Sequence, residues 1–293
     1  MKQVSSGIVD KDQYMIHRRS LLRGYARSAK GYEKEAVLQS AVRGQLQERI
    51  CFAHLVPEVV LDLGCGVGSA IADLKGLYPD ALVVGLDLCP EMLQQANRDQ
   101  GEFLCGDFEQ LPLQENSVDL VCANLSLHCA VDVEAPFAEV QRVLKPNGLF
   151  SFATFGPDSL RELRKAWSEV DSGVHIHRFL DMHDLGDALI RHGFSEPVLD
   201  VDQFQLSYKT PLLAMQDLKR IGESNSCQGR RRGLMGKETL NQVLKVCEEQ
   251  VVQEEFLSSF ELVFGQAWGR SDINQTKYMD KEIHIPLSQL KRG

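Results

Sequence analysis

The residues whose types and spacing point most directly to chemistry lie in VVLDLGCGVG, residues 59–68. An apolar run meets an acidic residue, Asp62, and three alternating glycines follow: Gly64, Gly66 and Gly68. Glycine lets the backbone adopt conformations, and approach a ligand, that a Cβ atom would block. We therefore predict a strand, a tight turn and a helix start that bind a nucleotide-type cofactor. A dinucleotide fingerprint needs its third glycine where this chain has Ser69, which argues against NAD.

A second acidic residue ends the next apolar segment, ALVVGLDL, residues 81–88. Asp87 comes nineteen positions after Gly68, and a carboxylate there can accept hydrogen bonds from both ribose hydroxyls of an adenosine. Alternatively, Asp87 caps a helix that starts at Pro90. We favour the ribose role and place Asp87, with the adjacent Leu88, at the cofactor.

Two later segments supply further candidates for the same cofactor. In EFLCGDFEQLPL, residues 102–113, Asp107 is placed to accept from an adenine amino group while Phe108 covers the ring; the alternative is an ordinary polar loop. SVDLVCANLSLH, residues 117–128, is a fourth predicted strand that opens into a loop, and Asn124 at its end is a further candidate cofactor residue.

The elements that must position these residues alternate between strand and helix patterns. That order predicts an α/β fold, in which ligands bind at the carboxyl ends of parallel strands. Four apolar residues at helical spacing predict a helix over about residues 33–54: Leu38, Val42, Leu46 and Ile50. The segment before it, residues 19–36, shows little hydrophobic pattern and is expected to fold over the cofactor. Tyr32 is a candidate catalytic residue there, or alternatively a surface aromatic.

We expect a single domain over residues 1–293. Its predicted parts are an N-terminal helical lid (1–55), a cofactor-binding core (56–204), a helical insertion (205–255) and a last strand with a C-terminal tail (256–293). The insertion separates a sixth strand near 197–204 from a seventh near 256–264. No apolar run in the first twenty residues is long enough for a secretion signal or a membrane span, so we expect a cytoplasmic protein that binds no membrane.

The eight cysteines include no C-x-x-C pair, which favours small buried residues over disulfides or zinc ligands, and we expect no metal. The net charge of −9 argues against nucleic acid as a partner. Between Gln205 and Lys245, however, eight basic and three acidic residues give a local charge of +5. Arg230, Arg231 and Arg232 within it are a candidate docking patch for an acidic carrier, or alternatively a solvated surface.

Together these motifs resemble the class I S-adenosylmethionine-dependent methyltransferases. The resemblance is carried by the glycine turn, Asp87, Asp107 and the sequence LKPNG at residues 144–148. It implies a Rossmann-like fold with a seven-stranded, mostly parallel sheet and helices on both faces, and it implies S-adenosylmethionine as the cofactor.

More specific segments resemble the malonyl-acyl-carrier-protein O-methyltransferases of biotin synthesis. They are SFATFGPDSLRELRKAW (151–167), HRFLDMHDLGDALIRHGFSEPVLD (177–200), GQAWG (265–269) and the ending IPLSQLKR. This resemblance implies methylation of the free carboxylate of a malonyl thioester, which starts pimeloyl synthesis. Its expected partner is malonyl-acyl carrier protein or malonyl-CoA, with the protein acting as a monomer.

A malonyl carboxylate is ionised at neutral pH, so the transfer needs alignment and exclusion of water more than a general base. A guanidinium suits a carboxylate because it offers a planar pair of donors. Arg161 and Arg164 are candidates to bind it, and we prefer Arg178 because the resemblance includes Arg-Phe at that position; each is otherwise a solvated charge. His128, at the end of the fourth strand, is a candidate catalytic donor or a structural histidine. The resemblance leads us to expect Trp after it, where this chain has Cys129.

Two alternatives belong to other functional classes. DLGDAL and IGESN (221–225) also resemble an arginine hydroxylase that assists assembly of mitochondrial complex I, although no transit segment is evident. A cofactor-binding assembly protein without catalytic activity would carry the same glycine turn and acidic residues.

Overall fold

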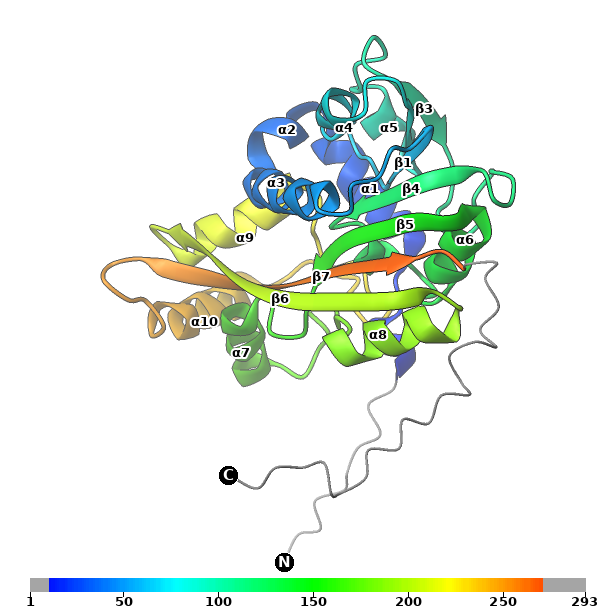
Figure 1. The fold of residues 1–293 in the computed structure, drawn as a ribbon. Coiled ribbons are helices and arrows are strands. Elements are labelled where there is room, and N and C mark those ends of the chain that lie inside the picture. The colour runs from blue at the N-terminus through cyan, green and yellow to red at the C-terminus, as the bar shows by residue number, and fades with distance from the viewer. Residues whose placement is uncertain (1–10, 271–293) are drawn as a thin grey trace, which may run out of the picture.

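A computed structural model describes residues 11–270 as a seven-stranded sheet with helices on both faces (Figure 1). The strands are β1 (Val59–Leu63), β2 (Leu82–Asp87), β3 (Glu102–Cys105), β4 (Val118–Asn124), β5 (Leu144–Phe155), β6 (Ser195–Tyr208) and β7 (Phe256–Trp268). Their order is β3-β2-β1-β4-β5-β7-β6, and only β7 runs antiparallel to its neighbours. The predicted mostly parallel α/β sheet is confirmed. The ending IPLSQLKR lies outside the described residues.

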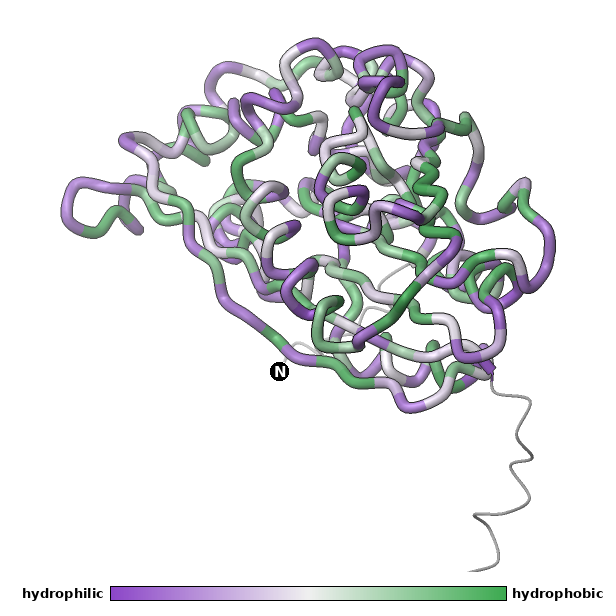
Figure 2. The backbone as a smooth tube through the Cα atoms, turned by 45° about the horizontal axis from the view of Figure 1, so that its top comes forward, coloured by the Kyte–Doolittle hydropathy of each residue, from purple (hydrophilic) through white to green (hydrophobic). Residues whose placement is uncertain are grey.

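Ten α-helices belong to the described residues: α1 (Arg18–Ser28), α2 (Tyr32–Glu35), α3 (Val37–Cys51), α4 (Ile71–Leu77), α5 (Pro90–Leu93), α6 (Ala135–Val143), α7 (Arg161–Val170), α8 (Met182–Arg191), α9 (Pro211–Arg220) and α10 (Lys237–Glu248). Two apolar clusters form the core. One joins α6 and α8 to the sheet, and the other joins α3 and α4 to it. Figure 2 shows hydrophilic stretches (purple) mostly along the outer loops. The strand ends that carry the candidate residues are therefore held between two packed layers.

The N-terminal segment agrees with prediction in one part and differs in another. The helix expected over 33–54 is present as α2 and α3, and the four apolar residues that predicted it are buried. The preceding segment, expected to have little pattern, forms helix α1, which buries only Leu21 and Ser28. Most of its residues are polar, so the segment has too little apolar content overall to stand out in the sequence.

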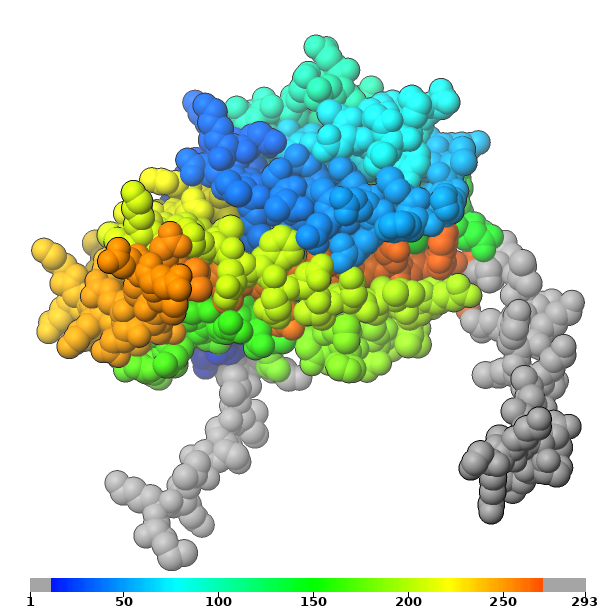
Figure 3. Space-filling model, turned by 60° about the vertical axis from the view of Figure 1, so that its left-hand side comes forward, coloured from blue at the N-terminus to red at the C-terminus, as the bar shows by residue number. Residues whose placement is uncertain are grey.

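The predicted insertion is helical, but it begins later than expected. β6 continues to Tyr208, past the expected boundary at residue 204, so α9 is the first inserted element. α10 packs against α7 through an apolar cluster that contains Leu163, Val243 and Cys247. Figure 3 shows the insertion (yellow to orange) as a lobe beside the N-terminal helices (blue).

The cysteines are free, and five of them are buried as predicted. Cys51 and Cys105 are exposed, which corrects the expectation of burial for those two, and Cys129 is half-buried. Among the helices of residues 11–270, none is long and apolar enough to cross a membrane.

One glycine shows how tightly β7 packs against β5. A Cβ atom on Gly265 would lie 2.2 Å from the ring of Phe152, which is fully buried. Gly265→Ala should therefore lower the free energy of unfolding by about 1–3 kcal/mol, the usual effect of overpacking a core. Gly44→Ala is the matched control, since that helix position has open space and the substitution should stabilise by about 0.5–1 kcal/mol. Urea titration measures both, and equal stability of the two variants would contradict this packing.

Candidate active site

The glycine turn after β1 has backbone conformations of the kind for which the sequence predicted glycine. Gly64, Gly66 and Gly68 have φ values of +75°, +57° and +79°, in the region that favours glycine. The amides of Gly64 and Cys65 both donate to the carbonyl of Leu86, at 2.8 and 3.0 Å, which holds the turn over the end of β2. A Cβ atom on Gly64 would lie 2.4 Å from that of Ser126. The turn therefore places bare backbone beside the β4 loop.

Asp87 is bonded to this turn through its side chain. One carboxylate oxygen accepts from the amide of Gly66 at 2.9 Å, and the other accepts from the amide of Cys89 at 2.7 Å. The second bond supports the start of α5, so a helix-start role exists beside the predicted ligand role. Burial raises the pKa of Asp87, and the two amide donors oppose that shift. Each oxygen keeps a lone pair for a ligand hydroxyl.

A cavity in front of the turn contains eight of the predicted site residues in its lining: Tyr32, Gly64, Gly66, Asp87, Leu88, Asp107, Phe108 and Asn124. Two predicted cofactor residues lie outside that lining. Gly68 packs against the ring of Phe103, and Asp62 lines a smaller cavity on the other side of the turn. Burial and the neighbouring Asp87 raise the pKa of the Asp62 carboxyl to about 7.

Helix α1 closes the cavity from outside, a contact that the sequence did not predict in detail. Arg18 forms ion pairs with Asp107 at 2.5 Å and Glu109 at 2.7 Å, and Leu21 and Tyr25 complete the wall. The Asp107 carboxylate predicted to accept from adenine is thus already paired with a cation on the lid. α1 and the β3 loop close the same end of the site.

The side chain of Asn124, at the end of β4, offers a hydrogen-bond acceptor to a cofactor that has a charged amino group. Its side-chain amide donates to the carbonyl of Gln39 at 3.0 Å, while its Oδ1 is buried without a partner among the described residues. The side-chain oxygen of Gln39 is also buried and unpaired there. Unpaired buried acceptors beside a carboxylate and bare backbone fit an ammonium-bearing nucleoside, because each would gain a donor.

His128 belongs to a buried polar cluster rather than standing alone. Its Nε2 lies 3.2 Å from both carboxylate oxygens of Glu223, and Tyr25 donates to the same carboxylate at 2.8 Å. Burial alone would lower the pKa of His128, but Cys129 and Glu223 raise it well above its ordinary value. Burial would raise the pKa of Glu223, but His128 and Tyr25 hold it below its usual range. Both shifts favour an imidazolium paired with a carboxylate.

A second cavity, of about 550 Å³, lies on the other side of this cluster. Most of its lining is apolar and includes Phe155, Trp167, Phe179, Met215 and Phe260. Glu223 lines this cavity, while its partner Tyr25 lines the first one. The rings of Phe155 and Phe179 also pack edge-on against His128, at 4.9 and 6.0 Å between centroids. The cluster therefore lies between the two cavities: Tyr25 and Cys129 line the first and Glu223 lines the second, while the buried His128 lines neither.

None of the three arginines predicted to bind a carboxylate lines either cavity. Arg161 is exposed and pairs with Glu162, and Arg164 donates to the carbonyl of His177 at 3.1 Å. Arg178 is exposed between His177 and Phe179, which both face the second cavity, so its side chain leaves the chain on the opposite side. The predicted guanidinium clamp is thus not formed, because alternate residues of an extended segment point in opposite directions.

The three arginines predicted to dock a carrier differ in their contacts and exposure. Arg230 donates to the hydroxyl of Ser20 at 2.6 Å and to the carbonyl of Cys227 at 2.9 Å, so it ties the insertion to α1. This corrects its assignment to the patch. Arg231 and Arg232 are exposed.

The fold, the glycine turn and the acidic residue at the end of β2 define a class I S-adenosylmethionine-dependent methyltransferase. A family model described as a methyltransferase domain matches residues 61–152. The solved structure of a SAM-dependent methyltransferase from Thermotoga maritima has the same fold, with a TM-score of 0.52 and 20% identity; the match covers 85% of this chain and 100% of that one.

Curated relatives identify the family within this class. The malonyl-[acyl-carrier protein] O-methyltransferase of Methylovorus sp. (strain MP688) is 40% identical over 88% of this chain and 90% of its own length. The protein of the same name from Halorhodospira halophila is 38% identical over 96% of this chain and 98% of its own. The chain belongs to the malonyl-[acyl-carrier protein] O-methyltransferase family.

The position of Asp87 leads to a binding prediction. Asp87→Ala should weaken S-adenosylmethionine binding by about 1–3 kcal/mol, because ribose hydroxyls would lose a buried acceptor. Calorimetric titration measures the dissociation constant, with the exposed Asp80→Ala as the matched control. An unchanged constant in a folded Asp87 variant would remove this carboxylate from the site.

His177 leads to a pH prediction. Burial lowers its pKa to about 4, and its Nε2 accepts from the amide of Ser226 at 3.0 Å, so the folded protein holds it neutral. Its unfolded pKa is about 6.5, so the unfolded state binds a proton first as pH falls. The free energy of unfolding should drop between about pH 6.5 and 4, by at most about 1.4 kcal/mol per pH unit.

His177→Gln, which keeps an acceptor without a titrating group, should flatten that part of the stability curve. The matched control is His183→Gln, since the His183 side chain is 87% exposed. Denaturant titrations at a series of pH values measure the slopes. Identical slopes for wild type and His177→Gln would show that this histidine does not titrate on unfolding.

Proposed function

We propose that this protein transfers the methyl group of S-adenosylmethionine to the free carboxylate of a malonyl thioester on acyl carrier protein. The observation that carries the proposal is the pair of cavities separated by the buried cluster of Tyr25, His128 and Glu223, in a chain whose relatives bear the name of this reaction. The resemblance in the sequence links the methyl ester to biotin synthesis.

The reaction requires alignment of the reactants and no proton transfer. The cofactor supplies an electrophilic methyl group on a sulfonium. One carboxylate oxygen bonds to the methyl carbon as the carbon–sulfur bond breaks, and the bonding electron pair stays on sulfur. Water must be excluded, because it would solvate the carboxylate and weaken its attack. Helix α1 and the apolar second cavity supply that exclusion.

In this proposal His128, which is buried between the two cavities, supplies the positive charge that was expected from Arg161, Arg164 or Arg178. Its Nε2 is paired with Glu223, whereas its buried Nδ1 has no hydrogen-bond partner within residues 11–270. A protonated ring carries a hydrogen on both nitrogens, so Nδ1 is left with a donor to offer to the carboxylate or the thioester carbonyl. Tyr32, half-buried in the wall of the cofactor cavity, is the second proposed catalytic residue. Burial raises the pKa of its phenol, which therefore stays neutral and can donate.

The arginine-hydroxylase alternative is not favoured, since the curated relatives are named as methyltransferases. A cytoplasmic location, a monomer and the absence of a nucleic-acid partner stay predictions. The direct test of function mixes the protein with S-adenosylmethionine and malonyl carrier protein and looks by mass spectrometry for a product heavier by one methyl group. Consumption of cofactor without that product would overturn the assignment of substrate.

Glu223→Gln tests the imidazolium. Without the carboxylate, burial should lower the pKa of His128, so the methylation rate should fall as pH rises and recover at acid pH. Wild type should keep its rate over the same range, because Glu223 holds the ring protonated. The pH profile of kcat measures this. A uniform loss at all pH values would indicate a structural role only, and an unchanged profile would remove Glu223 from the mechanism.

A further inference from the structure

The second cavity is too large and too apolar to serve a malonyl group alone. Its inner end is at Phe155, Phe179 and Glu223, beside His128. Its other residues come from α7, α9 and the start of the insertion's second helix, including Trp167, Met215 and Leu240. A malonyl group is short and has a single negative charge, so it would fill only the inner end, and an apolar wall offers its carboxylate no partner.

The outer end of this cavity reaches the surface between α9 and the segment before α10. Two lining residues are exposed there, Leu212 at 38% and Met235 at 43%, and the neighbouring Leu234 is 97% exposed. Exposed apolar residues grouped at the mouth of an apolar cavity are typical of a binding site rather than of ordinary surface.

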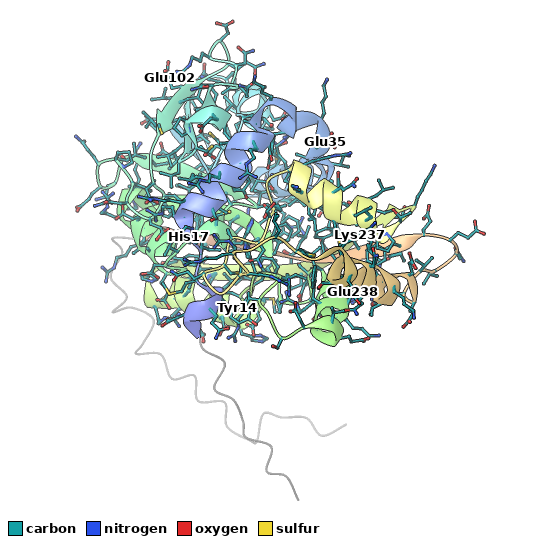
Figure 4. All side chains as sticks on the ribbon, turned by 180° about the vertical axis from the view of Figure 1, so that it is seen from behind. Tyr14, His17, Glu35, Glu102, Lys237 and Glu238 are labelled. Atoms are coloured by element: carbon teal, nitrogen blue, oxygen red, sulfur yellow. The ribbon has the colours of Figure 1, made fainter. Side chains whose placement is uncertain are left out.

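Positive charge surrounds the same mouth. Lys219 lines the cavity, is exposed and forms no ion pair among the described residues. Arg231, Arg232 and Lys237 lie in the exposed segment that leads into α10, and Figure 4 labels Lys237 where α10 begins, close to α9 (yellow). An apolar opening with a cationic rim is complementary to an acidic protein that delivers a long arm. The rim suits the acidic surface and the phosphate at the base of the arm, and the opening suits the uncharged remainder of the arm.

Resting on the proposed function, we infer that this cavity is the channel for the 4′-phosphopantetheine arm of an acyl carrier protein. The carrier docks on the mouth formed by Leu212, Leu234 and Met235, with its acidic surface and the arm's phosphate facing the cationic rim. The arm runs inward past Met215, and the malonyl carboxylate reaches His128. The docking cations are thus Lys219, Arg231, Arg232 and Lys237, without Arg230.

The first test narrows the channel and compares a substrate that has a long arm with one that has a short arm. Met215→Trp should lower kcat/KM for malonyl carrier protein at least about tenfold, because the larger side chain fills the path. It should change the value for malonyl-N-acetylcysteamine, whose short arm occupies only the inner end, by less than about twofold. Leu212→Trp at the mouth repeats the test where folding is least disturbed. Leu213→Trp is the matched control, since Leu213 is equally exposed at 38% but lines neither cavity.

The charged rim is tested separately. Replacing Lys219, Arg231 and Arg232 with Ser should reduce kcat/KM for malonyl carrier protein at low ionic strength and flatten its salt dependence, while malonyl-N-acetylcysteamine is unaffected. Arg98→Ser, an exposed cation elsewhere, is the control. Malonyl-CoA shows whether free coenzyme A is the natural source of the arm. If wild type used malonyl-CoA as well as malonyl carrier protein, and the triple variant lost as much activity on one as on the other, the carrier assignment would be overturned.

Two other outcomes would overturn the channel itself. Equal losses on the long and short substrates in Met215→Trp and Leu212→Trp would show a role in closing the site, and no loss on any substrate would show that the cavity stays empty. Failure of the proposed function is distinct, because wild type would then methylate none of the malonyl thioesters.

Discussion

The arrangement of this site depends on one buried ion pair. His128 and Glu223 lie inside the protein, where leaving either charge alone would be strongly destabilising. Each therefore requires the other, together with the hydroxyl of Tyr25. These residues come from the β4 loop, the segment after α9 and helix α1, so the pair brings the core, the insertion and the lid to one point. The complete cluster of His128, Glu223 and Tyr25 forms only when all three segments are in place.

This constraint explains why the protein has two cavities with a common wall. The glycine turn and Asp87 define the cofactor side, and the ends of β5 and the inserted helices define the other. Methyl transfer needs the acceptor oxygen, the methyl carbon and the sulfur in line. A substrate carboxylate in the second cavity must therefore reach the cofactor across the cluster that separates the two cavities. In the proposed mechanism, the His128 cation between the cavities draws the malonyl carboxylate to the position from which transfer takes place.

Much of the cofactor side could be predicted from the sequence, because it consists of local features. A strand that ends in a glycine turn, and acids that follow the next strands, meet at one edge of any parallel sheet. Asp87, Asp107, Phe108 and Asn124 accordingly line one cavity. The spacing of these residues along the chain is therefore enough to predict that they meet at one site.

The substrate side depends on contacts between distant segments, and the sequence offered little guidance there. Glu223 is 95 positions from its partner His128, and Arg18 is 91 positions from Glu109. Arg178 fits the expected chemistry by type, but the burial of its neighbours turns it outward. Residue type alone does not tell which charged side chain the fold buries.

The central claim is that His128 is a cation in the wall between the cavities. Nitrogen-15 NMR of the histidine-labelled protein, with His128→Gln for assignment, reports the protonation of each ring directly. We expect the His128 ring to keep the shifts of an imidazolium at about pH 8, where an ordinary histidine of pKa about 6.5 is neutral. A neutral His128 ring at that pH would contradict the account.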